Sequence, residues 1–336
     1  KVHTNAGIVG LGEPILEGRA LTCATGVKEV EPYLLGKDPR QVAHHWQAIY
    51  RHAFYRGGPI LTSVLSGIDQ ALWDIKGKAL GMPVWKMLGG GFFKRVRAYA
   101  STLFGHTPDE TRERGQRMVD HGFTAVKFGW APLGADEATD IALVREARRG
   151  VGDQTDLMID AGLCYDTKTA MQRARQFEPY RPFWFEEPLQ PDNYDGYRRL
   201  AESTSMRIAA GEEESNRLSY IELMDRGKID IVQVDLTRCG GFTEAMKIAS
   251  LAHDRGLPVV NHGFTTYVNI ASALHFLASI PNSFILEYVT EEETVLRNEI
   301  TRQDIRAVDG WVAIPDSPGL GVELNEEAVE KYRFRV

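Results

Sequence analysis

Cysteine is scarce in this sequence. Its 336 residues include three cysteines, Cys23, Cys164 and Cys239, an odd number at wide spacing. Disulfide-stabilised folds carry an even number of closely spaced cysteines, so such a scaffold is excluded and a reducing, cytoplasmic location is expected. The sequence also shows no signal peptide and no apolar run of about 18 residues, so no membrane partner is expected.

Positive charge is also in short supply. Lysine and arginine number 39 against 46 aspartates and glutamates, which gives a net charge of −7, and no basic run occurs. A nucleic acid partner is therefore excluded. The 25% of charged and 43% of hydrophobic residues are typical of a globular protein. The length suits a βα barrel of about 200 residues with a second module.

Six short apolar runs in the middle of the chain each end on an acid or a histidine. They are Leu157–Asp160, Phe183–Glu186, Ile208–Glu212, Ile231–Asp235, Val259–His262 and Phe284–Glu287. Each run has the length of a buried parallel strand, and about twenty residues with helical spacing separate consecutive runs, which is the pattern of a βα barrel. Such barrels carry their active sites at the strand ends, so we expect the polar residues on one rim.

Three of these polar ends are carboxylates at equal spacing. Asp160, Glu186 and Glu212 follow one another at intervals of 26 residues, so they rise from three adjacent strands. Carboxylates that close repel one another unless a cation lies between them. Oxygen ligands favour a hard ion, which predicts Mg²⁺, with Mn²⁺ as the second choice. Separate surface or capping carboxylates are the alternative, which the equal spacing disfavours.

A lysine and a tryptophan follow an earlier strand of the same pattern. The barrel is expected to begin at Val96–Ala100. Its second strand, Ala125–Phe128, carries Lys127 near its end, and Trp130 lies just beyond. A lone lysine there is commonly a solvated strand end. Because three carboxylates share this rim, we interpret Lys127 as a functional cation that faces them.

The other segments are predicted to form an α+β capping domain. Residues 1–92 make up its body, residues 290–336 join it, and residues 93–289 remain for the barrel. A helix is expected at 38–54, with Asp38 as its N-cap and Pro39 at its first position. A second helix is expected at 62–79, where apolar residues form one stripe.

Shorter features complete the expected cap. Residues 1–14 have the pattern of a strand in the middle of a sheet, and we expect an earlier strand to precede it. The glycine-rich loop Tyr55–Pro59 carries a phenol and a cation. Near the end of the chain, a helix is expected at 297–304 and a hairpin at 307–315.

Taken together, these residues resemble the enolase superfamily, mandelate racemase subgroup. The matching motifs are Asp160-Ala161-Gly162, Phe185-Glu186-Glu187-Pro188, Gly211-Glu212, Asp235 with Gly240-Gly241, Asn261-His262, Leu286-Glu287 and Pro315 to Gly321. The resemblance implies a modified (β/α)7β barrel of the α/β class with a capping domain. It also implies Mg²⁺ on the three carboxylates and a His262–Asp235 acid/base dyad that acts through an enediolate.

The chemistry of the residues agrees with these implied roles. Removing a proton next to a carboxylate adds a second negative charge to the substrate, which a metal and Lys127 can stabilise. Glu287 would hydrogen-bond the enediolate if it is protonated. Asp235 can fix the tautomer of His262 and stabilise its cation.

Two glycines depart from the pattern of the superfamily. Members with a Lys-x-Lys pair have a second lysine where this chain has Gly129, so the base for the opposite substrate face is missing. Gly162 stands where many relatives have Asn or His. The cap segments Tyr55–Ile60 and Gly67–Lys78 resemble the galactonate dehydratases, but those enzymes have a histidine at position 162. Galactonate is therefore not assigned as the substrate.

The resulting prediction is a Mg²⁺-dependent dehydratase that converts an aldonic or aldaric acid to a 2-keto-3-deoxy acid. Tyr55, Arg56 and Trp130 are expected to bind the anionic substrate. The alternatives are an epimerase or racemase, a lactone cycloisomerase, and a sugar-acid-binding protein without activity. Apolar helix stripes together with the resemblance predict a homo-oligomer.

Overall fold

A barrel of eight parallel strands makes up most of the computed structural model, which describes residues 1–52, 54–290 and 295–333. The strands are β3 Arg95–Leu103, β4 Ala125–Gly129, β5 Asp156–Asp160, β6 Trp184–Glu186, β7 Arg207–Ala210, β8 Ile231–Val234, β9 Val259–Asn261 and β10 Leu286–Val289. Neighbours from β3 to β9 pair in chain order, and β10 pairs with β3.

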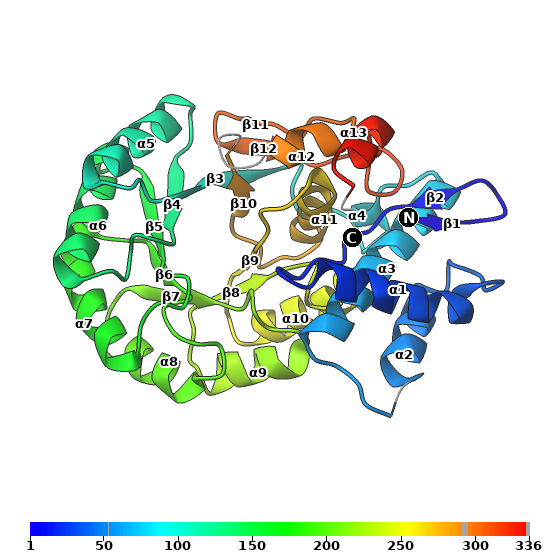
Figure 1. Cartoon of the computed structure of the whole chain (residues 1–336), viewed down its shortest axis with the longest axis horizontal. Helices are drawn as coiled ribbons and strands as arrows, with labels where there is room; N and C mark the ends of the chain where they lie inside the picture. The colour runs from blue at the N-terminus through cyan, green and yellow to red at the C-terminus, as the bar shows by residue number, and fades with distance from the viewer. Residues whose placement is uncertain (53, 291–294, 334–336) are drawn as a thin grey trace.

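Helices follow the first seven of these strands and surround the barrel (Figure 1). They are α5 Pro108–Asp120, α6 Glu137–Val151, α7 Thr167–Phe177, α8 Tyr194–Ala201, α9 Arg217–Asp225, α10 Gly241–Asp254 and α11 Tyr267–Ala278, with a 3-10 turn, η1 Glu178–Tyr180, after α7. The expected (β/α)7β order is confirmed. A capping box opens α5: the Thr107 side chain accepts a hydrogen bond from the Glu110 backbone N–H at 3.2 Å.

A layer of large and small side chains fills the barrel interior. It contains Tyr99, Ala125, Met158, Trp184, Ala209, Ile231, Val260 and Ile285. Tyr99 and Trp184 meet edge to face with ring centroids 5.3 Å apart. Burying one large apolar side chain stabilises a fold by roughly 1.5–3 kcal/mol, so this layer makes the barrel a rigid support for its rim.

The cap is largely helical and lies to one side of the barrel (Figure 1). Its elements are β1 Val2–His3, β2 Val9–Gly10, α1 Ala20–Leu34, α2 Val42–His52, α3 Pro59–Leu80 and α4 Val84–Met87. The predicted single strand at 1–14 is wrong, because β1 and β2 form a two-stranded antiparallel hairpin whose turn places Gly7 at φ +76°. Helix α1 was not predicted from the sequence, because its apolar stripe is weak and Pro32 lies inside the helix.

The expected helix at 38–54 is shorter than predicted. Asp38 accepts a hydrogen bond from the Arg40 backbone N–H at 3.0 Å and forms an ion pair with the same residue, so this stretch is a turn and α2 begins at Val42. Residue 53 lies outside the described residues. Helix α3 extends the predicted 62–79 at both ends, with Pro59 in its first turn and Gly81 in a left-handed cap.

The C-terminal segment returns over both parts of the molecule. Helix α12 covers Val295–Ile300, so the expected helix at 297–304 is only partly present, and residues 291–294 and 334–336 lie outside the described residues. Strands β11 Ala307–Val308 and β12 Trp311–Ala313 form the expected hairpin, and β12 pairs with β3. Helix α13 Glu326–Lys331 follows.

A buried aspartate joins this C-terminal return to the cap. Asp74 accepts hydrogen bonds from the backbone N–H groups of Leu11 at 2.9 Å and Leu320 at 2.8 Å, and Lys78 forms an ion pair with it at 2.6 Å. The division into 1–92, 93–289 and 290–336 stays a prediction. Among the described helices, none is long and apolar enough to cross a membrane.

Helix α3 packs against the loop that follows β8. Gln70 donates to the Leu236 carbonyl at 2.8 Å, and Ser66 accepts from the Gly240 N–H at 2.8 Å. Trp46 of α2 donates to the Gly240 carbonyl at 2.8 Å. Because all three polar contacts are buried, the cap fixes the position of a loop that begins with Asp235.

Candidate active site

Strand register places the predicted polar residues on one rim. Gly129 of β4 lies opposite Asp160 of β5, which in turn lies opposite Glu186 of β6. Asp235 and His262 come directly after β8 and β9. These side chains therefore leave neighbouring strand ends in the order that the sequence predicts.

Glu287 departs from this pattern. The run Phe284–Glu287 is not the eighth strand, which begins at Leu286 and continues to Val289. The pairing of β10 with β3 sets this register, in which Glu287 lies opposite Tyr99. The side chain still enters the site, because Glu287 Oε1 lies 2.7 Å from Lys127 Nζ.

Lys127 is the centre of a buried cluster of carboxylates. Its ammonium forms ion pairs with Glu186 and Glu287 and lies 3.7 Å from Asp160 Oδ2. Burial alone would lower the pKa of Lys127, but Glu186 and Glu287 outweigh it and hold this pKa well above its usual value. The prediction that Lys127 faces the carboxylates is met.

The pKa shifts of the carboxylates in this cluster differ in direction. Burial raises the pKa of Asp160 and raises that of Glu186 to about 8, although Lys127 partly opposes both shifts. Burial also acts on Glu287, but Lys127 and His262 lower its pKa below the usual value. Both carboxylate oxygens of Glu287 face donors, Oε1 the Lys127 ammonium at 2.7 Å and Oε2 the Gly263 N–H at 2.9 Å, so this arrangement does not favour a protonated Glu287 donor.

His262 and Asp235 form a hydrogen-bonded pair. His262 Nδ1 lies 2.8 Å from Asp235 Oδ2, and Asp235 Oδ1 accepts from the backbone N–H and the hydroxyl of Thr237 at 2.7 and 2.6 Å. His262 Nε2 lies 3.2 Å from Glu212 Oε2. Burial would lower the pKa of His262, but Glu212 and then Asp235 raise it to about 10. Asp235 fixes the ring so that Nε2 points toward Glu212.

The predicted metal ligands fit a hard cation by charge and donor type. Asp160, Glu186 and Glu212 offer only oxygen, and burial, which disfavours their charged forms, raises the pKa of each. Their arrangement is not that of a formed cage. In residues 1–52, 54–290 and 295–333, no three acidic, histidine or cysteine side chains are placed to hold one metal ion. Lys127 and the Trp184 indole N–H, at 2.7 Å from Oε2, bind the two oxygens of Glu186 instead.

A cavity of about 330 Å³ opens beside these groups. Its lining consists of Ser101, Thr102, Leu103, Lys127, Gly129, Trp130, Asp160, His262, Phe264, Glu287 and Val289. The sequence analysis missed the contributions of β3, Phe264 and Val289. Their signal is weak, because an apolar residue at a strand end looks like any other core residue.

Trp130 lies at this cavity and packs over Gly162, one of the two glycines that depart from the superfamily pattern. The residue has a left-handed backbone (φ +67°) and is 57% exposed. A Cβ atom on Gly162 would lie 3.2 Å from its indole ring. Trp130 thus covers the position that a larger residue 162 would occupy. A Cβ on Gly129 would likewise lie 2.9 Å from Asp160 Oδ2.

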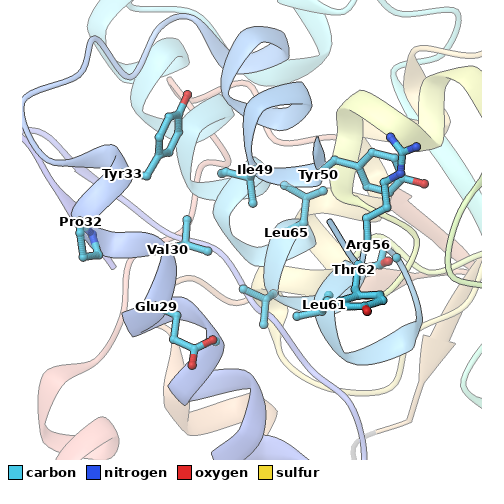
Figure 2. A pocket seen from close by; sticks show the side chains of 14 residues that line it. Glu29, Val30, Pro32, Tyr33, Ile49, Tyr50, Arg56, Leu61, Thr62 and Leu65 are labelled. Carbon is cyan, nitrogen blue, oxygen red and sulfur yellow. The ribbon is translucent and has the colours of Figure 1, made fainter. Parts of the chain in front are cut away.

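Tyr55 and Arg56 are not among the residues that line the barrel cavity. They line a separate cavity of about 510 Å³ among the cap helices α1, α2 and α3. Figure 2 shows Arg56 beside Tyr50, and its guanidinium carbon lies 5.9 Å from the centroid of the Tyr50 ring. Tyr55 is 82% exposed. Their predicted contact with substrate stays a prediction.

Two family models match the chain. The mandelate racemase / muconate lactonizing enzyme N-terminal domain matches residues 1–89, and the enolase C-terminal domain-like model matches residues 110–328. The chain belongs to the mandelate racemase / muconate lactonizing enzyme family of the enolase superfamily. Members of this superfamily generally use a divalent metal.

Relatives of known name cover nearly the whole chain. The D-galactonate dehydratase of Pectobacterium atrosepticum is 37% identical over 340 residues, which are 98% of this chain and 89% of the relative. The D-galactonate dehydratase of Variovorax paradoxus is 37% identical over 342 residues with the same coverage. The crystal structure of the 3,6-anhydro-D-galactonate cycloisomerase from Zobellia galactanivorans superimposes with a TM-score of 0.93 at 34% identity, covering 100% of this chain and 93% of that one.

Proposed function

We propose that this enolase superfamily member is a sugar-acid dehydratase that acts on an acid of the galactonate type and gives a 2-keto-3-deoxy acid. One observation carries the proposal: the His262–Asp235 pair, Lys127 and Glu287 meet around one cavity in a chain that is 37% identical to D-galactonate dehydratases.

His262 is the proposed base. Its Nδ1 is held by Asp235, which leaves Nε2 as the atom that takes the proton α to the substrate carboxylate. With Glu212 ionised, His262 has a pKa of about 10 and is protonated near neutral pH. Neutralising the charge of Glu212 removes the main cause that raises this pKa, and so returns His262 to its basic form.

The proposed ligands of a divalent cation are Asp160, Glu186 and Glu212. When bound, the cation would neutralise these carboxylates and withdraw charge from the substrate carboxylate. Lys127 supplies a second positive charge at the same cavity, where low polarity strengthens its attraction for the enediolate. Mg²⁺ is preferred and Mn²⁺ is the second choice, because all three ligands are hard oxygens.

The elimination needs an acid for the leaving hydroxide. His262 becomes protonated in the first step, and it can return that proton to the β-hydroxyl if the proton and the hydroxide leave from the same face. Lys127 forms an ion pair with Glu287 at 2.7 Å, and Glu287 is not a proposed ligand of the cation, so Lys127 is assigned the stabilisation of charge and not the removal of the α-proton. A two-base epimerase is disfavoured, because it needs a second base on the opposite face of the substrate and Gly129 has no side chain to supply one.

A lactone or anhydro-acid cycloisomerase is the second candidate. The structure of a 3,6-anhydro-D-galactonate cycloisomerase matches the whole of this chain, and Trp130 covers Gly162 where the galactonate dehydratases have a histidine. The cycloisomerase reaction would differ from the dehydration only in its leaving group. If the β-oxygen belongs to a ring ether, the same elimination opens the ring and releases no water.

A substrate screen tests both candidates. Aldonic and aldaric acids, including D-galactonate and its 3,6-anhydro form, are incubated with the enzyme with and without Mg²⁺, and 2-keto product is detected chemically and by NMR. Product from an open-chain acid supports the dehydratase, and product from the anhydro acid alone supports the cycloisomerase. Acids that bind without any turnover would instead identify a binding protein.

The predicted homo-oligomer remains a proposal. It rests on the apolar helix stripes and on the superfamily resemblance. Analytical ultracentrifugation at micromolar concentration tests it, and a single monomeric species would contradict it.

A further inference from the structure

Arg238 lies between the cap and the His262–Asp235 pair. It belongs to the loop after β8, and its side chain is 8% exposed. Its Nη2 atom donates to Glu17 Oε2 of the cap at 2.6 Å, while its Nε lies 3.7 Å from Asp235 Oδ2 and its Nη1 lies 3.9 Å from Glu212 Oε1. One planar guanidinium thus faces three carboxylates from three different segments.

Glu17 is carried by the cap loop that precedes α1. The start of this loop is fixed: Glu13 accepts from the Thr266 hydroxyl at 2.7 Å and from the Asn269 N–H at 3.1 Å, both at the start of α11. Residues 17–19 are exposed. Figure 1 shows the dark-blue segment before α1 reaching toward the barrel near β8 and β9. The Glu17–Arg238 ion pair therefore attaches the exposed end of the loop to the rim.

The position of Arg238 is also constrained from the barrel side. Its backbone N–H donates to the Asp235 carbonyl at 3.1 Å, which closes a turn directly after β8. Its Nε atom is buried and has no hydrogen-bond partner among the described residues. A small movement of the guanidinium toward Asp235 Oδ2, the oxygen that binds His262, would satisfy this donor.

We propose that Arg238 is a positioning residue that couples the cap loop carrying Glu17 to the geometry of the Asp235–His262 pair. When Glu17 holds Arg238, the guanidinium is fixed beside Asp235. When the loop leaves, Arg238 can turn toward Glu212 and Asp235, and the His262 ring shifts with its partner. The inference rests on the proposed function insofar as His262 is the base; the coupling itself is a property of the unliganded protein.

The test compares Glu17→Gln, Arg238→Lys, Arg238→Met and the double variant Glu17→Gln/Arg238→Met. The Nδ1–H proton signal of His262 is identified in the parent NMR spectrum as the signal that His262→Asn lacks. Glu29→Gln is the matched control, because Glu29 is a cap carboxylate on α1 that lines the separate cap cavity. Hydrogen exchange of residues 12–19 reports the attachment of the loop.

We expect Glu17→Gln to accelerate exchange of the loop and to shift the His262 signal, whereas Glu29→Gln changes neither. In the Arg238→Met background, Glu17→Gln should no longer affect His262. Arg238→Lys keeps the positive charge but loses the planar guanidinium, so it should shift the His262 signal by an intermediate amount. If Arg238→Met does not fold, Arg238→Lys takes its place in the comparison. When the assay uses a substrate that the enzyme converts to product, Glu17→Gln should lower kcat on the order of tenfold and change KM less.

The proposal is overturned if Glu17→Gln leaves the His262 signal in place, or if it shifts that signal equally with and without Arg238. The His262 signal and the hydrogen exchange of the loop can both be measured without a substrate. A substrate screen without product would reject the proposed activity and leave the coupling result standing.

Discussion

Replacing His262 by asparagine should abolish both product formation and exchange of the substrate α-proton with solvent. The asparagine amide can still donate to Asp235, so the variant removes the basic Nε2 and keeps the 2.8 Å contact approximately in place. A positioned general base contributes about a hundred- to ten-thousand-fold. This range corresponds to roughly 3–5 kcal/mol of activation free energy.

The structure limits the activity that could remain. Among the described residues that line the cavity, Lys127 is the basic side chain besides His262. An ordinary lysine with a pKa of about 10.4 is neutral in roughly one molecule in a thousand at pH 7.5. Glu287, which is not a proposed ligand of the cation, acts in the direction that raises the pKa of Lys127 and so favours its charged form. Residual exchange through Lys127 should therefore lie below about a thousandth of the parent rate.

The assay follows deuterium incorporation at the α-carbon by NMR in D₂O, with the acid that the screen identifies. His253→Asn is the matched control, because His253 is exposed on α10 and should leave the activity unchanged. Mg²⁺ binding should survive in His262→Asn. Deuterium incorporation near the parent rate in that variant would refute the reasoning, since it would assign the base to Lys127 and favour an epimerase.

Three further predictions concern the metal site and the packing of the barrel. Glu212→Gln should weaken Mg²⁺ binding at least about tenfold in calorimetric titrations, because it removes a charged ligand. Gly129→Ala should weaken it by about tenfold as well, since the new Cβ atom would lie 2.9 Å from Asp160 Oδ2 and displace that carboxylate. His275→Gln should reduce the loss of stability in acid. Burial lowers the pKa of His275 to about 4 from 6.5, so its contribution is fully present above pH 6.5 and lost as the pH falls toward 4, by about 3 kcal/mol in total.

Each of these predictions has a control and a contrary outcome. Glu213→Gln alters the exposed neighbour of Glu212 and should bind Mg²⁺ like the parent; equal binding by both variants would remove Glu212 from the ligand set. For Gly129→Ala, an unchanged Mg²⁺ affinity with a folded protein would show that Asp160 is not a ligand or moves freely. For His275→Gln, urea unfolding at pH 4.5 and 7.5 is compared with His253→Gln, and parallel curves would contradict the buried neutral imidazole.

Local sequence was sufficient to predict the barrel and the rim. Buried parallel strands are continuous apolar runs, and a polar residue ending each run is visible without any structure. The same reasoning brought Asp160, Glu186, Asp235 and His262 to one edge. A capping residue such as Thr107 acts within one turn of helix, so the start of α5 can be predicted from local sequence, whereas α3 begins at Pro59 and not at the expected residue 62.

Tertiary packing decided the features that depend on distant partners. Two dipeptide strands replace the expected strand at 1–14, because pairing within a hairpin depends on the turn at Gly7. The register of β10 is set by its hydrogen bonds to β3, which no pattern within Phe284–Glu287 reveals. Tyr55 and Arg56 line the cap cavity because the packing of α1 to α3 carries their loop there.

The electrostatics of the site are the clearest case. The sequence by itself supplied the carboxylates and the cations, and it determined that they share a rim. Only the fold decided that Lys127 lies between Glu186 and Glu287, and that Glu17 of the cap reaches Arg238. Strand order follows from short-range patterns along the chain, whereas the distance between two charged side chains depends on how separate elements pack, and Coulomb energies change steeply over those few ångströms.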